Sequence, residues 1–397
     1  MWLAAGIVVL VAAGAYAVAR SDQPGSPAVA RSPTGSLGPA GSPSASPWPS
    51  AAGACGATAY RPLMSPLPLT ERTGARVLVG GYGLRLVDAD SGKTRAVAGI
   101  PTDARHMVSD LVSAAGVVYV LSTPCDGRAG RVYRLEHNMA RPVAAAPVDD
   151  LLAGTTRVWT VEYPAPGAAP ATPVVLRPVD GGRALALPPD AYPVADTGAG
   201  LVVTRGYTDE AGTPPRVLLL DPTTARPVRT LGVGRPLSAD RSHLLLLLGP
   251  CDAGQATPAC TLVRVEVRTG RVHGRYHLPT GRVPVSAGSL SRDGRQAVFQ
   301  LARAHSDPRF DPGHPVPPAD IAVLHLDTGR LDIVPGLELS PKTGAGLAFA
   351  ADGSWIFATV SDGDHAHVLA WRPGLGAPRS VARLSGPIVW APPVQIA

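Results

Sequence analysis

Residues 289–302 read SLSRDGRQAVFQLA, and residues 320–336 read DIAVLHLDTGRLDIVPG. Together they form one unit, in which short apolar runs are separated by a tight polar turn, a long loop and a second tight turn. Asp293-Gly294 and the Asp-Thr-Gly sequence at 327–329 supply the residues that connect neighbouring antiparallel strands. An inner strand precedes the first turn, so the unit predicts a four-stranded antiparallel sheet.

The same unit recurs along the chain. The next copy reads LAFAADGSWIFATV at 347–360, HVLAWRP at 367–373 and SVARL at 380–384. Five weaker copies precede these two, and their strands equivalent to 320–326 begin near residues 84, 131, 173, 216 and 261. A repeat of about forty residues is typical of a propeller blade. The sequence therefore predicts an all-β fold, a seven-bladed β-propeller.

The first copy, at 76–100, lacks a clear inner strand, and the chain ends with a surplus apolar run, PIVWAPP, at 387–393. We expect this C-terminal tail to complete the first blade, because a ring left open would expose two strand edges. The alternative is that residues 57–70 supply the missing strand and the tail stays loose.

Composition limits the classes of function. Lys and Arg number 36 against 30 Asp and Glu, which gives a net charge of +6. Nearly all the positive charge is Arg, and these residues are scattered among predicted turns rather than grouped in runs. A nucleic-acid-binding protein concentrates positive charge on one face beside stacking aromatic residues. We therefore expect no nucleic-acid partner.

The N-terminus carries an unbroken apolar stretch, WLAAGIVVLVAAGAYAVA, at 2–19. It is long enough to cross a bilayer as a helix, and we predict a transmembrane anchor at 1–20. A cleaved signal peptide is the main alternative, because 15–17 and 17–19 both fit a small-x-small cleavage pattern. A buried core helix is the third interpretation. An anchor makes the protein single-pass, with the propeller outside the cytoplasm, and cleavage makes it secreted.

Residues 21–54 are almost entirely Pro, Ser, Gly and Ala, a composition that forms no packed core. We predict a disordered linker there, followed by the propeller domain at 55–397. An extended chain of this length reaches about 100 Å, at about 3 Å per residue. The linker is then either a stalk that lifts the propeller off the membrane or a segment without selected function.

Four cysteines lie in or beside the propeller domain. Cys251 and Cys260 flank one loop between two apolar runs, and a hairpin there brings them within bonding distance. This leaves Cys55 to pair with Cys125, which ties the end of the linker to the second repeat. An even number of cysteines at such spacing suits an oxidising compartment, and no C-x-x-C sequence indicates structural zinc.

The pattern of S-x-D-G, strand, loop, strand and D-x-x-G resembles the TolB-like, or WD-repeat-like, bacterial β-propeller family. The resemblance covers most of residues 70–397, although only the last two copies match well and LSADRSHLLLL at 237–247 is a degenerate version. The Gly-His and Trp-Asp signatures of true WD repeats are absent. The resemblance implies a periplasmic or extracellular propeller and leaves the ligand open, because this fold serves many functions.

Two neighbouring long loops hold the candidate ligand-binding residues. They are His305, Asp307, Asp311 and His314 in the sixth copy and Asp362, Asp364, His365 and His367 in the seventh. Neutral imidazoles and carboxylates together are able to hold a divalent metal ion, although no particular metal is specified. The alternative is that they are solvated loop residues. The Asp-Gly-Asp piece does not have the spacing of an EF-hand calcium loop.

No G-x-S-x-G sequence indicates an α/β-hydrolase nucleophile. The leading hypothesis is therefore a monomeric, non-enzymatic binding module that recognises an envelope protein or cell-surface component through its long loops, since function concentrates on loops held by a rigid scaffold. One alternative is a propeller hydrolase or lyase with a metal- or His-based site at the channel mouth. A second is a structural envelope protein.

Overall fold

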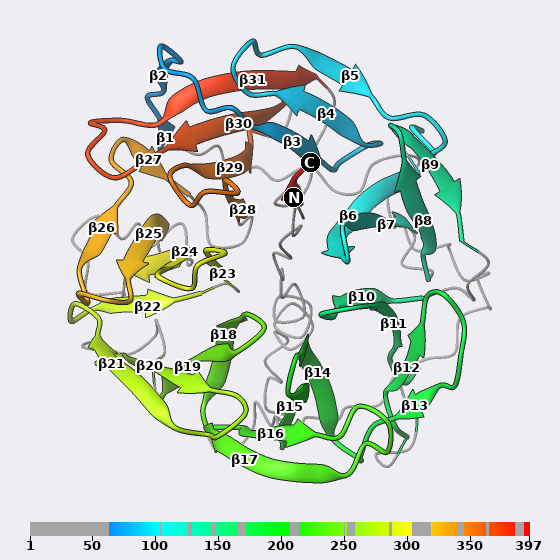
Figure 1. The fold of residues 1–397 in the computed structure, drawn as a ribbon. Helices are drawn as coiled ribbons and strands as arrows, with labels where there is room; N and C mark the ends of the chain where they lie inside the picture. Colours follow the sequence, from blue (N-terminus) through cyan, green and yellow to red (C-terminus); the bar gives the residue numbers. More distant parts are fainter. Residues whose placement is uncertain are drawn as a thin grey trace, which may run out of the picture.

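The computed structural model describes residues 63–397, apart from 104, 126–128, 144–147, 166–167, 169–171, 207–213, 250, 252–258, 286–287, 304–318, 340–344, 363–364 and 386–392. Within these residues the chain forms seven small antiparallel sheets arranged as blades in a ring (Figure 1). The predicted all-β, seven-bladed propeller is confirmed. No helix among the described residues has the length and apolarity to cross a membrane. The predicted anchor and linker lie outside these residues.

Each of the first four blades has four strands, which follow one another from the channel outward. Blade one is β32 (Val394–Ile396), β3 (Arg76–Val79), β4 (Arg85–Asp88) and β5 (Thr94–Ala96); blade two is β6 (His106–Ala114), β7 (Val117–Pro124), β8 (Arg131–Glu136) and β9 (Met139–Pro142); blade three is β10 (Asp150–Ala153), β11 (Val158–Glu162), β12 (Val175–Pro178) and β13 (Leu185–Ala186); blade four is β14 (Ala191–Thr197), β15 (Gly200–Arg205), β16 (Arg216–Leu220) and β17 (Pro227–Val233).

The last three blades follow the same order, with additions at their edges. Blade five is β18 (Arg235–Ala239), β19 (His243–Leu248), β20 (Thr261–Glu266) and β21 (Val272–His277); blade six is β22 (Arg282–Pro284) and β23 (Ser289–Leu290), which both pair with β24 (Gln296–Arg303), then β25 (Ala319–His325) and β26 (Leu331–Ile333); blade seven is β28 (Gly346–Phe349), β29 (Ile356–Ser361), β30 (His365–Trp371) and β31 (Arg379–Ser385).

The C-terminal tail closes the ring, as the sequence predicts, but with a later segment than expected. Strand β32 begins at Val394 and pairs antiparallel with β3, Val79 opposite Val394 and Val77 opposite Ile396. The predicted strand at 387–393 is wrong at its last residue, since Pro393 lies outside β32; its other residues fall outside the described part of the chain. Proline lacks the N–H that a strand ladder needs, so regular pairing starts after it.

The alternative source of the closing strand, residues 57–70, is also excluded. Strand β1 (Leu63–Met64) pairs with β27 (Leu337–Glu338) after blade six, and β2 (Leu67–Pro68) adds in parallel to β31 at the outer edge of blade seven. The chain therefore enters on the outer wall of the wheel, beside β31 and far from the channel (Figure 1). The Glu71 carboxylate then meets Arg372, which ties this entry segment to blade seven.

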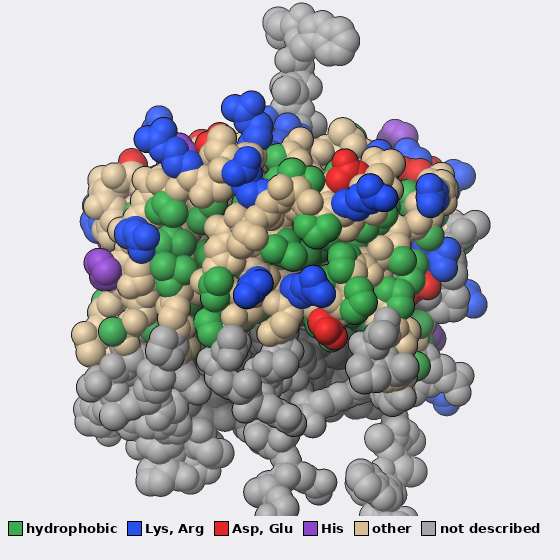
Figure 2. All heavy atoms as spheres, turned by 90° about the horizontal axis from the view of Figure 1, so that it is seen from below, with side chains coloured by type: hydrophobic (Ala, Val, Ile, Leu, Met, Phe, Trp, Pro, Cys, Tyr) green, Lys and Arg blue, Asp and Glu red, His purple; other side chains and the backbone are tan. Residues whose placement is uncertain are grey.

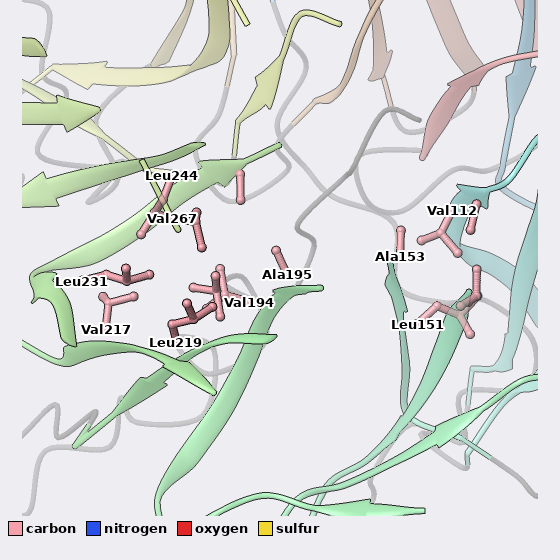
Figure 3. Close-up of a cluster of buried hydrophobic side chains, with 14 of the residues drawn as sticks. Val112, Leu151, Ala153, Val194, Ala195, Val217, Leu219, Leu231, Leu244 and Val267 are labelled. Carbon is pink, nitrogen blue, oxygen red and sulfur yellow. The ribbon is translucent and has the colours of Figure 1, made fainter. Parts of the chain in front are cut away.

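The hydrophobic core lies between blades, because both faces of each sheet are covered by neighbours. Leu219 of β16 and Leu244 of β19 are almost fully buried in one continuous cluster, which also contains Val112 and Leu151 of blades two and three (Figure 3). Three tryptophans that the sequence places in strands, Trp159, Trp355 and Trp371, are buried as well. A blade removed from the ring would expose two apolar faces, so each blade depends on its neighbours.

The outer wall differs from this core. Its strands carry exposed apolar side chains such as Val228 of β17, which is 60% exposed, and Val272 of β21. Figure 2 shows apolar side chains on this wall interspersed with Lys and Arg. Charged residues along an outer strand hinder pairing with another chain.

Closure by β32 predicts a specific loss of stability. Val394 is fully buried, whereas Val228 is mostly exposed. We expect Val394→Ala to lower the free energy of unfolding by about 1–3 kcal/mol, and Val228→Ala to change it by less than about 0.5 kcal/mol. Chemical denaturation of the two variants measures both values. Equal values for the two valines would contradict closure by β32.

Candidate functional site

The strand order places two kinds of connection on opposite faces of the wheel. The loops from the second to the third strand, together with the segments between blades, lie on one face, which we call the long-loop face. Its longest connections are 163–174, 206–215, 249–260 and 304–318. The other face carries the first-to-second and third-to-fourth strand turns, and we call it the short-turn face.

One hydrogen-bonded turn recurs on the short-turn face. In blade one the Gly92 N–H donates to the Asp88 carbonyl at 2.9 Å, and in blade six the Gly329 N–H donates to the His325 carbonyl at 2.7 Å. Gly92 and Gly329 both have positive φ, which glycine adopts without strain. The glycine turn residues found in the sequence are thereby confirmed.

A covalent link holds one long loop at its base. Cys251 and Cys260 form the predicted disulfide, with their Cα atoms 5.3 Å apart. None of the described cysteines, Cys125 included, is a free thiol. The predicted partner of Cys125, Cys55, lies outside the described residues.

The candidate ligand residues divide into two groups. His305, Asp307, Asp311, His314 and Asp364 lie outside the described residues. The structure brings the remaining three together at the start of β30, where Asp362 Oδ2 is 2.9 Å from His367 Nε2 and Asp362 Oδ1 is 3.6 Å from His365 Nδ1. The Arg383 guanidinium lies 2.9 Å from His365 Nδ1.

This blade-seven cluster is a hydrogen-bonded network of Asp362, His365, His367 and Arg383. Arg383 contacts Nδ1 of His365, and a cation beside that nitrogen opposes binding of a second cation there. No group of three or more His, Cys, Asp or Glu side chains among the described residues is placed to hold a metal. A metal site that also uses the 304–318 loop stays a prediction.

The structure reveals a second cluster that the sequence reasoning missed. Asp110 lies in the inner strand of blade two, and Asp150 begins the inner strand of blade three. The Asp110 side chain is buried, with the residue only 4% exposed, and its Oδ1 accepts from the Leu111 N–H at 2.8 Å. Asp150 Oδ1 accepts in the same way from the Leu151 N–H at 2.9 Å. Two neighbouring blades thus each turn a carboxyl group toward their shared boundary.

Both carboxyl groups resist ionisation. Burial, and then the negative charge of Asp150, raise the pKa of Asp110 well above its ordinary value. Burial also raises the pKa of Asp150 to about 6, against the lowering effect of the Leu151 N–H. Removal from water disfavours the charged form, and a like charge nearby adds to that effect. Perturbed carboxyls of this kind occur often at functional sites.

Three further residues complete what we call the acidic notch, which consists of Asp110, Asp149, Asp150, Tyr163 and Tyr192. The exposed Asp149 carboxylate accepts from the Tyr163 N–H at 2.7 Å. The Tyr163 and Tyr192 rings lie 6.3 Å apart at 34°. Burial, followed by the charges of Asp150 and Asp149, raises the pKa of the Tyr163 hydroxyl. These residues belong to the long-loop face, because all of them except Asp110 lie at its strand ends.

One sequence signal for the notch was available. Asp110 is the one acidic residue in the inner strand at 106–114, and Asp149-Asp150 precedes the apolar residues at 151–153. Aspartate is seldom buried unless it is paired or functional. The individual blades were recognisable, but their lateral packing was needed to bring these positions together.

A buried ion network supports the longest loop. Arg303 is the last residue of β24 and Asp320 is the second residue of β25, on either side of loop 304–318. Their side chains are both less than 10% exposed. Arg303 Nη2 lies 2.7 Å from Asp320 Oδ1, and Arg303 Nη1 lies 3.1 Å from Glu338 Oε1. Arg282 makes a further contact with Asp320. The network fixes where this loop leaves and re-enters the wheel.

Comparison with known proteins supports the fold. No family model and no curated protein matches the chain. Among solved structures it is similar to TolB from Acinetobacter baumannii, with 13% identity over 81% of this chain and 66% of that one, at a TM-score of 0.42. It is also similar to a Mycobacterium tuberculosis puromycin-hydrolysing peptidase, with 17% identity over 85% of this chain and 56% of that one, at a TM-score of 0.50.

A prolyl endopeptidase shows the same level of similarity, with 12% identity over 85% of this chain and 50% of that one, at a TM-score of 0.50. The chain thus spans about half the length of the two peptidases and 66% of TolB. TolB and other propellers are therefore among its structural neighbours, as the resemblance in the sequence implied. At these identities the similarity concerns the fold alone.

The contribution of the Arg303–Asp320 network to the free energy of unfolding can be measured. We expect Arg303→Ala to lower the free energy of unfolding by about 3–5 kcal/mol, because it leaves Asp320 buried without its main partner. Arg177→Ala is the matched control, since Arg177 pairs with Glu162 at the surface and such pairs contribute at most about 1 kcal/mol. Chemical denaturation measures both. Similar losses for the two arginines would show that the buried network is unimportant.

The carboxyl pair predicts how stability changes with pH. The pKa values of Asp110 and Asp150 are raised in the folded protein. Above the ordinary aspartate pKa of about 4, the folded protein therefore binds more protons than the unfolded chain. The free energy of unfolding then falls as the pH rises from about 4 to 7. Asp110→Asn keeps the neutral shape and should remove part of that fall. We expect the variant to be more stable than the wild type at pH 7 by about 1–3 kcal/mol.

Thermal denaturation from pH 4 to 7 measures this slope. Asp190→Asn, at an exposed position on the same face, should leave the slope unchanged. A wild-type slope in the Asp110→Asn variant would contradict the assigned protonation of the pair.

Proposed function

We propose that the propeller is a binding module that recognises a protein of the cell envelope or cell surface through its long-loop face. The observation that carries this proposal is the difference between the two faces. The short-turn face carries only short turns, whereas the long-loop face carries the long connections at 163–174, 206–215, 249–260 and 304–318. A disulfide closes one loop, and the Arg303–Asp320 network holds another. Rigid bases lower the entropy that a loop loses on binding.

The proposed setting is outside the cytoplasm, with the chain anchored through residues 1–20. The apolar stretch at 2–19 and the Pro- and Ser-rich linker support this setting. The Cys251–Cys260 disulfide supports it as well, because disulfides persist in oxidising compartments. A similarity of fold to peptidases does not favour an enzyme, since propellers serve both binding and catalysis.

Photocrosslinking in the native host tests the proposal. Two exposed threonines offer a matched pair: Thr280 lies between β21 and β22 on the long-loop face, and Thr328 lies in the β25–β26 turn on the short-turn face. We expect a photoreactive residue at 280 to capture one envelope or surface protein that the same residue at 328 does not. A third probe at Phe310 extends the test to the longest loop. Equal capture from both faces, or none from positions 280 and 310, would contradict the proposal.

A further inference from the structure

A small pocket lies where blades seven and one meet at the long-loop face, and we call it the blade-one pocket. Its walls are the β3–β4 loop, one side chain of β4 and the end of β31, and its residues are 80–83, Arg85, Leu384 and Ser385. It contains about 260 Å³ of space, less than the roughly 300–1,000 Å³ of sites that enclose a drug-sized molecule. A pocket of this size suits one functional group of a larger molecule.

Strand geometry places the Arg85 side chain in this pocket. Side chains two residues apart lie on the same face of a strand. Val87, two residues after Arg85, packs with Leu384 in the apolar cluster between blades seven and one. Arg85 therefore lies at the end of that interface, where Ser385 is the last residue of β31.

The charge of Arg85 is not balanced within the pocket. Arg85 is half-buried, and its guanidinium forms no hydrogen bond or ion pair with any residue that the structure describes. None of the residues that line the pocket is acidic. Partial removal of a charged group from water without a partner is unfavourable. A bound anion would supply that partner through charge-assisted hydrogen bonds.

The glycine-rich β3–β4 loop adds neutral donors to this charge. Gly81 and Gly83 have φ values of 139° and 90°, and the N–H group of neither donates to a described residue. Gly83 is buried, and a buried N–H without an acceptor is rare. The Gly80 N–H donates to the Pro393 carbonyl at 2.9 Å. The Val108 N–H donates to the Gly81 carbonyl at 2.7 Å, so the loop is fixed on both sides.

We propose that the blade-one pocket binds a carboxylate group carried by a protein partner. The Arg85 guanidinium matches the geometry of a carboxylate and is able to donate two parallel hydrogen bonds to it. Free backbone N–H groups at positive φ form concave sites for anions, and such sites capture carboxylates in other proteins. The inference rests on the proposed function, because it names a group by which the partner of the long-loop face is recognised.

The lining of the pocket favours a carboxylate over a phosphate group or a metal ion. Arg85 is the one charged residue in the lining, whereas a phosphate ester carries nearly two negative charges at neutral pH. The lining contains no His, Cys, Asp or Glu to coordinate a metal ion, and the arginine opposes a second cation. A carboxylate on a polypeptide needs only its own two oxygens to enter.

The test uses the full chain and three blocked peptides, with binding measured by saturation-transfer NMR. Acetyl-Gly-Leu has a free C-terminal carboxylate, acetyl-Gly-Asp-Gly-amide has a side-chain carboxylate, and acetyl-Gly-Leu-amide has none. We expect a carboxylate peptide to bind about tenfold or more tightly than the uncharged amide. The tighter of the two carboxylate peptides shows whether the partner presents a chain end or an acidic side chain. Equal binding of all three peptides, or tighter binding of inorganic phosphate, overturns the inference.

Variants assign the binding to the pocket. We expect Arg85→Gln to weaken the carboxylate peptide about tenfold or more, and Arg85→Lys to have intermediate affinity because it keeps the charge without the planar guanidinium. Arg95→Gln is the matched control, since Arg95 is exposed on β5 of the same blade and lies outside the pocket. It should bind like the wild type. Thermal denaturation checks that each variant is folded, and unchanged binding in folded Arg85→Gln overturns the inference.

Crosslinking separates this inference from the proposed function. If position 280 captures a partner and Arg85→Gln lowers that capture, both proposals are supported. Capture that Arg85→Gln leaves unchanged supports the binding module and overturns the carboxylate site. If positions 280 and 310 capture no partner while the peptide binds through Arg85, the proposed function fails and the carboxylate chemistry of the pocket stands. Acetate that binds as tightly as the peptide shows a site for free carboxylates and excludes the partner-borne group.

Discussion

Ring closure is the constraint on which the rest of this structure depends. Each blade buries apolar side chains against both neighbours, as Leu219 and Leu244 do between blades four and five. Such packing requires seven neighbours in a cycle, and the cycle exists only because β32 pairs with β3. Three residues at the end of the chain therefore hold together an interface that extends around the whole molecule.

Ring closure also explains the positions of the buried ionisable side chains. The interior between blades is apolar and leaves few places for ionised groups, so buried charges occur near the strand ends. In blade six these charges are balanced, because Arg303 contacts both Asp320 and Glu338. At the boundary of blades two and three, by contrast, the carboxyls of Asp110 and Asp150 face each other, and burial raises the pKa of both. The same scaffold thus contains one polar cluster that stabilises a loop and another that reduces stability at neutral pH.

The fold could be predicted from the sequence because the signals that define each blade lie between residues that are close together in the chain. Turn residues such as Asp293-Gly294 and the two-residue alternation of strands repeat within each blade, and both depend only on near neighbours in the chain. The closing strand was assigned to the correct end of the chain, although its described residues begin at Val394, one residue after the predicted run at 387–393. The notch could not be predicted in this way. Asp110 and Asp150 are forty residues apart in the numbering, and only the contact between blades brings them together.

The strand order has a consequence for how the protein is made. Strand β3 (Arg76–Val79) is synthesised more than 300 residues before its partner β32 (Val394–Ile396), so blade one stays incomplete until β32 has left the ribosome. Contacts between segments so far apart in sequence form slowly, because closing so long a loop is entropically unfavourable. During synthesis the edge of β3 therefore remains open to other strands. Pairing of β1 and β2 does not shorten this exposure of β3, because their partners in blades six and seven are also synthesised late.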